Sequence, residues 1–252
     1  MVIDALKAKL EKREKIYSSM LCHVGCTLLP NIYKGAGLDM LVMDLEHGSF
    51  YPENIGDFCK ACHEAELPVI ARVQDCEYHC ISKPLDMGAD GVLIPRTESF
   101  EQVETAINSM RFYPYGKKGV GGRALLRKGE DIYDFNKNRL LFLQIESQKG
   151  VDLLDEMLTR YGDQVAGVII GPNDMGVSMG TGLDMEAPAL VANWKKVTEV
   201  ATKHGKSSGM FMVNDKEAER WYKEGMNIFW IGTELSLFGA ELKRTGKRVQ
   251  EF

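Results

Sequence analysis

Short apolar runs alternate with amphipathic stretches along almost the whole of this 252-residue chain. Nearly continuous apolar runs of five to seven residues are typical of parallel strands that are buried on both faces of a sheet. The clearest runs span residues 41–46, 69–73, 91–95, 141–146, 165–171, 209–213 and 228–232. An eighth, weaker run, which contains glycine and cysteine, lies within residues 20–29. This alternation limits the chain to folds in which helices cover a parallel sheet.

The stretches between the runs carry helix signals. Ser99 with Gln102, and Asn214 with Glu217, have the spacing of residues that begin a helix. Two apolar stripes at helical spacing consist of Leu153, Leu154, Met157 and Leu158, and of Leu190, Trp194 and Val197. We interpret both stripes as core packing.

Eight strands alternating with helices in about 250 residues predict a (β/α)8 TIM barrel in an α/β chain. The main competing fold is a doubly wound sheet, which a phosphate-binding glycine turn after the first strand would favour. The glycine-rich string at residues 116–122 lies mid-chain and matches neither that pattern nor the Walker pattern. No linker or repeat divides the chain, so we expect a single domain over residues 1–252.

Charge and composition exclude several classes of protein. The formal net charge is −5, which argues against a nucleic-acid partner because phosphate neutralisation needs a basic face. No apolar run reaches the roughly 18 residues of a membrane span, and the charged amino terminus lacks the apolar core of a signal peptide. We therefore expect a cytoplasmic protein with no membrane partner. We interpret the six cysteines, including Cys59 and Cys62 of a C-x-x-C-H string, as structural thiols.

Polar residues end several of the apolar runs. In a barrel these positions meet at one mouth, where function collects. The residues concerned are Asp44, Glu46 and His47, then Arg72, then Gln144 and Glu146, and finally Asp174 just beyond the run at 165–171. Each alone could be a helix cap or an ion-pair partner. Together they predict a site, because converging carboxylates repel unless a cation separates them, and a hard divalent ion with oxygen ligands suits that role.

The ordered strings GAGLDMLVMDLEHG, IARV, LDMGADGVLIPR, FYPYGKKGVGG, LQIES and GPNDMGVSMG resemble those of the HpcH/HpaI aldolases. The resemblance covers about residues 15–240. It implies a phosphoenolpyruvate/pyruvate-type TIM barrel and a class II aldolase that needs Mg2+, Mn2+ or Co2+. Such an enzyme reversibly cleaves a 4-hydroxy-2-oxo acid to pyruvate and an aldehyde, through a pyruvate enolate held by the metal. Examples of such acids are 4-hydroxy-2-oxoheptanedioate and 2-dehydro-3-deoxyglucarate.

The resemblance also implies roles for individual residues. Glu146 and Asp174 match the metal ligands, and Arg72 matches the arginine that binds pyruvate. His47 matches the catalytic acid/base, with Asp86 as its aspartate partner. The remaining matches are substrate-binding positions, which are Asp44, Gln144, Gly171, Pro172 and Asn173. The family implies a homo-oligomer, a hexamer built from dimers that exchange carboxyl-terminal helices, here about residues 234–252.

One departure concerns the aldehyde half of the substrate. The family's arginine in the glycine-rich string is Lys118 here, and the string continues as Gly121, Gly122 and Arg123. Two other functions stay open: a citrate-lyase-type or malyl-CoA-type lyase, and a non-catalytic barrel that binds metal and a 2-oxo acid. A Schiff-base mechanism is not expected, because Lys83 and Lys149 end no apolar run and are predicted to lie on solvated helices.

Overall fold

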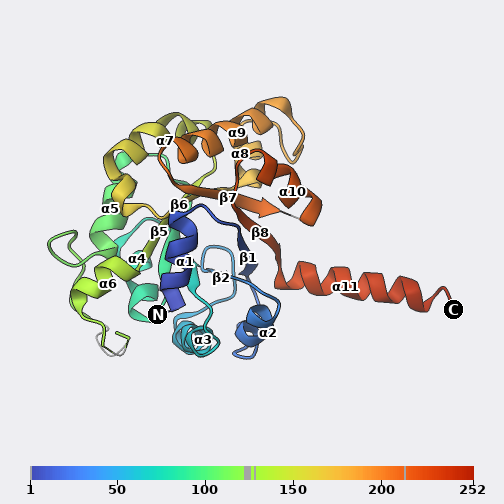
Figure 1. Cartoon of the computed structure of the whole chain (residues 1–252), viewed down its shortest axis with the longest axis horizontal. Coiled ribbons are helices and arrows are strands. Elements are labelled where there is room, and N and C mark those ends of the chain that lie inside the picture. Colours follow the sequence, from blue (N-terminus) through green and yellow to red (C-terminus); the bar gives the residue numbers. More distant parts are fainter. Residues whose placement is uncertain (1, 122–125, 128, 213) are drawn as a thin grey trace.

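Eight parallel strands close into a barrel in the computed structural model, which describes residues 2–121, 126–127, 129–212 and 214–252 (Figure 1). Each strand pairs with its neighbours in chain order, and β1 pairs with β8 to close the sheet. The strands are β1 (Ile16–Leu21), β2 (Met40–Asp44), β3 (Val69–Arg72), β4 (Gly91–Ile94), β5 (Leu140–Ile145), β6 (Gly167–Ile170), β7 (Ser207–Met212) and β8 (Ile228–Thr233). The predicted TIM barrel is confirmed, and the doubly wound alternative is excluded.

The first strand was misplaced by the sequence pattern. The weak run at 20–29 overlaps β1 only at Met20 and Leu21, because β1 begins earlier, at Ile16. Two buried serines, Ser18 and Ser19, interrupt the apolar character of the true strand and hide it. The other seven strands fall within the predicted runs to within two residues at each end, although Val213 lies outside the described residues.

Helices surround the barrel, and the predicted starts are confirmed. Ser99 accepts a hydrogen bond from the Gln102 backbone N–H at the start of α5, and Asn214 accepts from the Lys216 and Glu217 N–H groups at the start of α10. The helices are α1 (Val2–Glu11), α2 (Leu29–Gly35), α3 (Pro52–Glu64), α4 (Tyr78–Asp86), α5 (Phe100–Met110), α6 (Ile132–Asn138), α7 (Gln148–Tyr161), α8 (Pro172–Ser178), α9 (Pro188–Lys203), α10 (Asp215–Lys223) and α11 (Glu234–Val249), with a 3-10 turn η2 (Gly162–Gln164).

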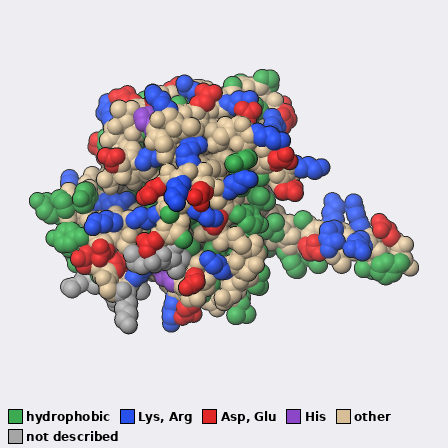
Figure 2. Space-filling view, viewed as in Figure 1, with side chains coloured by type: hydrophobic (Ala, Val, Ile, Leu, Met, Phe, Trp, Pro, Cys, Tyr) green, Lys and Arg blue, Asp and Glu red, His purple; other side chains and the backbone are tan. Residues whose placement is uncertain are grey.

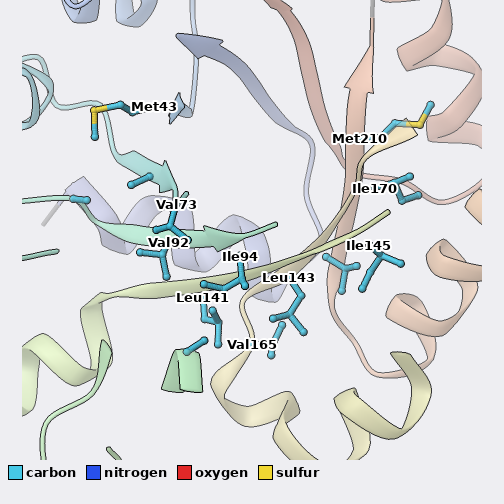
Figure 3. Packing of buried hydrophobic residues seen from close by; sticks show 14 of the residues in the cluster. Met43, Val73, Val92, Ile94, Leu141, Leu143, Ile145, Val165, Ile170 and Met210 are labelled. Atoms are coloured by element: carbon cyan, nitrogen blue, oxygen red, sulfur yellow. The ribbon is translucent and has the colours of Figure 1, made fainter. Parts of the chain in front are cut away.

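The core has two layers, one on each side of the strands. Inside the barrel, Phe142, Ile169 and Trp230 pack with Ile3 and Leu6 of α1, which closes the amino-terminal end of the barrel. The larger layer lies between strands and outer helices, and Figure 3 shows part of it from β2 to β7. It includes the two stripes predicted on α7 and α9, of which only Leu153 is partly exposed. With both faces buried, the strands have few places for polar side chains except their ends.

The carboxyl-terminal helix α11 projects away from the barrel (Figure 1). Its apolar side chains Leu235, Phe238 and Leu242 are exposed, and Figure 2 shows hydrophobic and basic side chains on different sides of the projecting helix. An exposed apolar stripe on a helix that projects from the fold is the usual mark of a protein interface.

All six cysteines are free thiols, and the C-x-x-C-H string lies on α3. Cys59 and Cys62 belong to the outer core layer, and burial raises the pKa of the Cys59 thiol to about 12. None of the helices in the described part of the chain has the length and apolar character needed to cross a membrane.

Candidate active site

A cavity of about 260 Å3 opens at the carboxyl-terminal end of the barrel. Its wall takes Met20 from β1, Gln144 from β5, Phe211 from β7 and Trp230 from β8. The other lining residues are His47, Arg72, Ile170, Gly171, Pro172, Asn173, Asp174 and Thr233. Seven of the predicted site residues therefore line one cavity, although they come from four different segments of the sequence.

Arg72 and Asp44 form a buried ion pair at the ends of β3 and β2. Arg72 Nε donates to Asp44 Oδ1 at 2.8 Å, and Nη2 donates to Oδ2 at 2.7 Å. Burial alone would raise the pKa of Asp44, but the arginine and the Glu46 and His47 backbone N–H groups hold it below its usual value. Asp44 is fully buried and does not line the cavity, so its geometry fits a residue that positions Arg72.

Glu46 was grouped with the polar residues at the strand ends in the sequence, but no role was assigned to it. Its carboxylate lies 3.5 Å from Arg72 Nη1, 3.5 Å from Arg96 Nε and 3.8 Å from His47 Nε2. Burial raises the pKa of Glu46, although its neighbours, Arg72 and Arg96 among them, oppose the rise. Its two-residue spacing from Asp44 puts both side chains on one face of the extended chain, and the structure accordingly places both carboxylates beside Arg72.

Glu146 follows β5 and is buried, with no hydrogen-bond partner for Oε1. Burial first, then the negative charges of Asp174 and Glu46, raise the pKa of Glu146 to about 7. Gly171 packs directly against this carboxylate, since a Cβ at residue 171 would lie 2.4 Å from Glu146 Oε1. The glycine at the end of β6 therefore leaves the space that Glu146 occupies.

Asp174 lies in the first turn of α8, whose amino terminus is at Pro172. Asn173 and Asp174 are both exposed to the cavity, whereas Gln144 is buried with an unpartnered Oε1. Among the described residues, no three His, Cys, Asp or Glu side chains are grouped to hold a metal ion. The donor set offered by Glu146 and Asp174 thus has two carboxylates.

This donor set fits a divalent cation. Glu146 is a buried carboxylate with a raised pKa and an unpartnered oxygen, and the charge of Asp174 contributes to that rise. A positive charge between the two carboxylates would stabilise their ionised forms. Two protein oxygens leave the other coordination positions of a hard cation to water and substrate, which is the usual arrangement for Mg2+.

His47 and Asp86 do not meet within the chain. His47 lines the cavity with its side chain 68% exposed. Asp86 is the last residue of α4, at the far end of the helix that follows β3, and accepts a hydrogen bond from Lys118 Nζ at 2.5 Å. Arg96, the first basic residue after β4, contacts Glu46 and Asp75 and makes no ion pair with Asp86 in the described chain.

The glycine-rich string departs from its expected place at the substrate. Lys118 is buried between Asp86 and the rings of Phe112 and Phe135, and it does not line the mouth cavity. Gly122 and Arg123 lie outside the described residues. Lys83 and Lys149 are exposed on α4 and α7, as predicted, and neither lines the cavity.

The apolar wall of the cavity was missed by the sequence reasoning. Met20, Ile170, Phe211 and Trp230 line it, with Thr233 at its edge. Phe211 and Trp230 pack edge to face, with ring centroids 6.1 Å apart. The position of Phe211 next to the end of β7 could have suggested it, whereas Trp230 lies in the middle of β8 and aromatic residues in strands are usually core.

Comparison with known proteins decides the family. The sequence model of the HpcH/HpaI aldolase/citrate lyase family matches residues 27–240. The chain belongs to the HpcH/HpaI aldolase/citrate lyase family. It is therefore an enzyme of the lyase class, and the resemblance found in its sequence is confirmed.

Individual relatives agree with this assignment. A 5-keto-4-deoxy-D-glucarate aldolase of Escherichia coli O157:H7 is 32% identical over 211 residues, which are 81% of this chain and 80% of the relative. The crystal structure of an HpcH/HpaI aldolase from Desulfitobacterium hafniense DCB-2 superimposes with a TM-score of 0.89 at 26% identity, covering 98% of this chain and 97% of that one. An HpcH/HpaI aldolase/citrate lyase family protein from Burkholderia cenocepacia J2315 shares the fold at 22% identity, with a TM-score of 0.90 and coverage of 98% and 99%.

Proposed function

We propose that this chain is a divalent-metal-dependent class II aldolase that cleaves a 4-hydroxy-2-oxo acid to pyruvate and an aldehyde, reversibly. The observation that carries the proposal is the Glu146 carboxylate, which is buried, unpartnered at Oε1 and coupled to Asp174 beside Arg72 and His47. The relatives named as aldolases support the reaction class.

Glu146 and Asp174 would hold Mg2+, Mn2+ or Co2+. A cation bound there would act as a Lewis acid that polarises the 2-oxo group of the substrate. Gln144, with its unpartnered Oε1, and the backbone around Gly171 and Pro172 would position the 2-oxo acid. Asn173, exposed at the same edge, would contact the substrate as well.

Arg72 would bind the oxygen that becomes negative as the C3–C4 bond breaks. Its Nε and Nη2 are held by Asp44, which fixes the plane of the guanidinium, and Nη1 lies 3.5 Å from the Glu46 carboxylate. Nη1 is thus the arm not held by Asp44, and it would donate to the substrate oxygen. Donors that are fixed before reaction stabilise developing charge without reorganisation. Asp44 would thus act through Arg72, as a positioning residue.

His47 would take the proton from the 4-hydroxyl group. The electrons of that O–H bond form the aldehyde carbonyl, and those of the C3–C4 bond pass to the enolate of pyruvate, which is protonated at C3. The exposure of His47 at the cavity edge lets it reach the substrate hydroxyl directly or through water. Asp86 of a neighbouring subunit would orient it.

An assay of pyruvate release tests this function. The panel of 4-hydroxy-2-oxo acids should include 5-keto-4-deoxy-D-glucarate, and each should be tested with EDTA and with Mg2+, Mn2+ or Co2+. We expect metal-dependent turnover, with kcat/KM lowered at least about 30-fold in Arg72→Lys, since a lysine cannot reproduce a two-armed guanidinium. Full activity in rigorously metal-free protein would contradict the class II assignment.

The competing functions predict other outcomes. A malyl-CoA-type lyase needs cations for the coenzyme A phosphates, and Arg72 is the one Lys or Arg among the described residues that line the mouth. Cleavage of a CoA thioester or of citrate, with no activity on 2-oxo acids, would favour that class of lyase. Binding of pyruvate and metal without turnover would favour a non-catalytic barrel.

We also propose a cytoplasmic homo-oligomer, a hexamer built from dimers. The six free thiols support a reducing compartment. The projecting α11, with Leu235, Phe238 and Leu242 exposed, supports exchange of the carboxyl-terminal helices, about residues 234–252, between subunits. The oligomeric state in solution, measured by light scattering, tests this assembly.

A further inference from the structure

A second cavity, of about 310 Å3, lies at the end of the barrel opposite the mouth. It is bordered by α1, which closes this end, and by the segments that lead into β5, β6 and β7. Figure 1 places α1 in front of the strands, so this end faces the viewer in Figures 1 and 2. Its volume is in the range of small-ligand pockets. The proposed aldolase chemistry makes no use of it.

The charged residues that line this cavity are mostly cations. Five are Lys or Arg and two are Asp or Glu, namely Lys7, Arg111, Lys137, Arg139 and Lys206 against Glu11 and Asp163. Figure 2 shows Lys and Arg side chains on this face near the position of α1. Such a lining repels a metal ion and attracts an anion.

Arg111 is a buried cation in the wall of this cavity. It is only 6% exposed, and no carboxylate pairs with it anywhere in the described chain. Its Nη1 donates to the Arg139 carbonyl at 2.7 Å and its Nε to Gln164 Oε1 at 3.3 Å, which leaves Nη2 without a hydrogen bond to a described residue. Burial, and then the charge of Arg139, lower the pKa of Arg111 to about 10. A buried guanidinium without a counter-ion is costly.

The neighbouring cations are only partly neutralised. Arg139 pairs with Glu130 at 2.9 and 3.0 Å, but its buried Nε has no partner. Lys206 is half-buried, and burial lowers its pKa against the opposing charges of Asp163 and Glu11. Lys137 is exposed at the rim. An anion in the cavity would therefore meet uncompensated positive charge from several directions.

We propose that this cavity is a binding site for a small polyanionic metabolite, whose phosphate or paired carboxylate groups contact Arg111, Lys137 and Lys206. Guanidinium and ammonium groups form short, charge-assisted hydrogen bonds with both kinds of oxyanion. The ligand is not the substrate, because the site lies at the closed end of the barrel. The proposal for this site therefore does not depend on the aldolase reaction proposed for the mouth.

Calorimetric titration of the full-length, metal-loaded protein tests the site. Inorganic phosphate and succinate serve as separate probes at constant ionic strength, so that their relative affinities identify the kind of oxyanion. We expect saturable binding of at least one probe, weakened at least tenfold in the double variant Lys137→Gln/Lys206→Gln. The Lys216→Gln variant removes an exposed charge of α10 away from the cavity and should bind as the wild type does. The bound anion should also raise Tm by about 5 °C or more at a hundredfold excess over Kd.

Two further variants keep the test decisive. Arg111→Gln should abolish binding, and the lysine variants still decide the matter if the loss of Arg111 prevents folding. Arg72→Lys at the mouth should leave the affinity unchanged. The proposal is overturned if neither probe binds up to about 20 mM, if the double lysine variant binds normally, or if Arg72→Lys alone removes the binding.

Discussion

At the scale of single residues, the Glu146 carboxylate occupies space that is open only because residue 171 is a glycine. Gly171 has an extended backbone with a φ of −94°, a conformation open to any residue, so its identity is explained by space alone. A methyl group there would lie 2.6 Å from Glu146 Cγ and 2.4 Å from Oε1. Glycine at this position is therefore a requirement of the proposed metal site and is not needed for the turn.

We predict that Gly171→Ala weakens metal binding at least about tenfold, because Glu146 must move from its place. Mn2+ affinity, measured by electron paramagnetic resonance, is the readout. Gly35→Ala on α2 is the matched control, since a Cβ there meets nothing within 4 Å. Unchanged Mn2+ affinity in Gly171→Ala would show that Glu146 does not ligate from this position.

The raised pKa of Glu146 predicts how the stability of the metal-free protein depends on pH. The folded pKa is about 7 and the ordinary value 4.5, so between these values the folded state binds more protons than the unfolded state. Stability from this carboxyl is complete below pH 4.5 and falls as pH rises towards 7, by about 3 kcal/mol.

Urea unfolding in EDTA at pH 5 and at pH 7.5 measures this loss. In Glu146→Gln, which cannot titrate, the difference in unfolding free energy between the two pH values should shrink by about 2 kcal/mol, because part of the loss has already occurred at pH 5. Equal differences in both proteins would mean that the Glu146 carboxyl does not titrate in this range. Added Mg2+ should restore stability at pH 7.5 in the wild type only, because it replaces the missing proton between the carboxylates.

At the scale of elements, the first residue of α11 ties this helix to the loop after β1. The Glu234 carboxylate accepts hydrogen bonds from the backbone N–H groups of Cys22, His23 and Val24, at 2.5 to 3.1 Å. Three donors that would otherwise lack partners are satisfied by one buried carboxylate. The contact fixes the start of a helix that then leaves the barrel.

We predict that Glu234→Gln lowers stability by about 1–3 kcal/mol, because an amide offers one acceptor oxygen and places N–H donors against N–H donors. For a chain of this size the fall in Tm is about 3–10 °C. Calorimetry of Glu241→Gln, an exposed change on the same helix, is the control and should show an unchanged Tm. A normal Tm for Glu234→Gln would mean that these hydrogen bonds are not needed.

At the scale of the whole molecule, the separation of His47 and Asp86 predicts a site shared between subunits. His47 lies at the carboxyl ends of the strands, whereas Asp86 ends a helix that runs back from that face. If Asp86 orients His47, Asp86 must come from a neighbouring chain. Its contact with His47 of the other subunit would then compete with its hydrogen bond from Lys118.

Co-expression of His47→Ala and Asp86→Ala tests the shared site. Each variant alone should be weak, and random mixed oligomers should recover about a quarter of the wild-type sites, since an intact His47 from one chain can meet an intact Asp86 from the other. If mixed oligomers form, as shown by differently tagged chains, and activity stays at the level of the parents, the two residues do not share a site.

The sequence by itself determined the barrel and the identity of most mouth residues. Seven strands could be placed because nearly continuous apolar runs are a local signal of strands buried on both faces. The strand ends then located Arg72, Glu146 and Asp174, since parallel strands in a closed barrel bring all their carboxyl ends to one side. The position of β1 was predicted wrongly because two serines interrupt its apolar run.

Only the tertiary structure decided how these residues pair. Asp44 could face substrate or hold Arg72, and the register of β2 against β3, which sets Asp44 beside Arg72, settled its contact. The same holds for Gly171 against Glu146, Glu234 against the loop after β1, and Arg111 against the Arg139 carbonyl. These contacts join residues far apart in the chain, and their energies depend on burial and distance, which no local pattern of residues encodes.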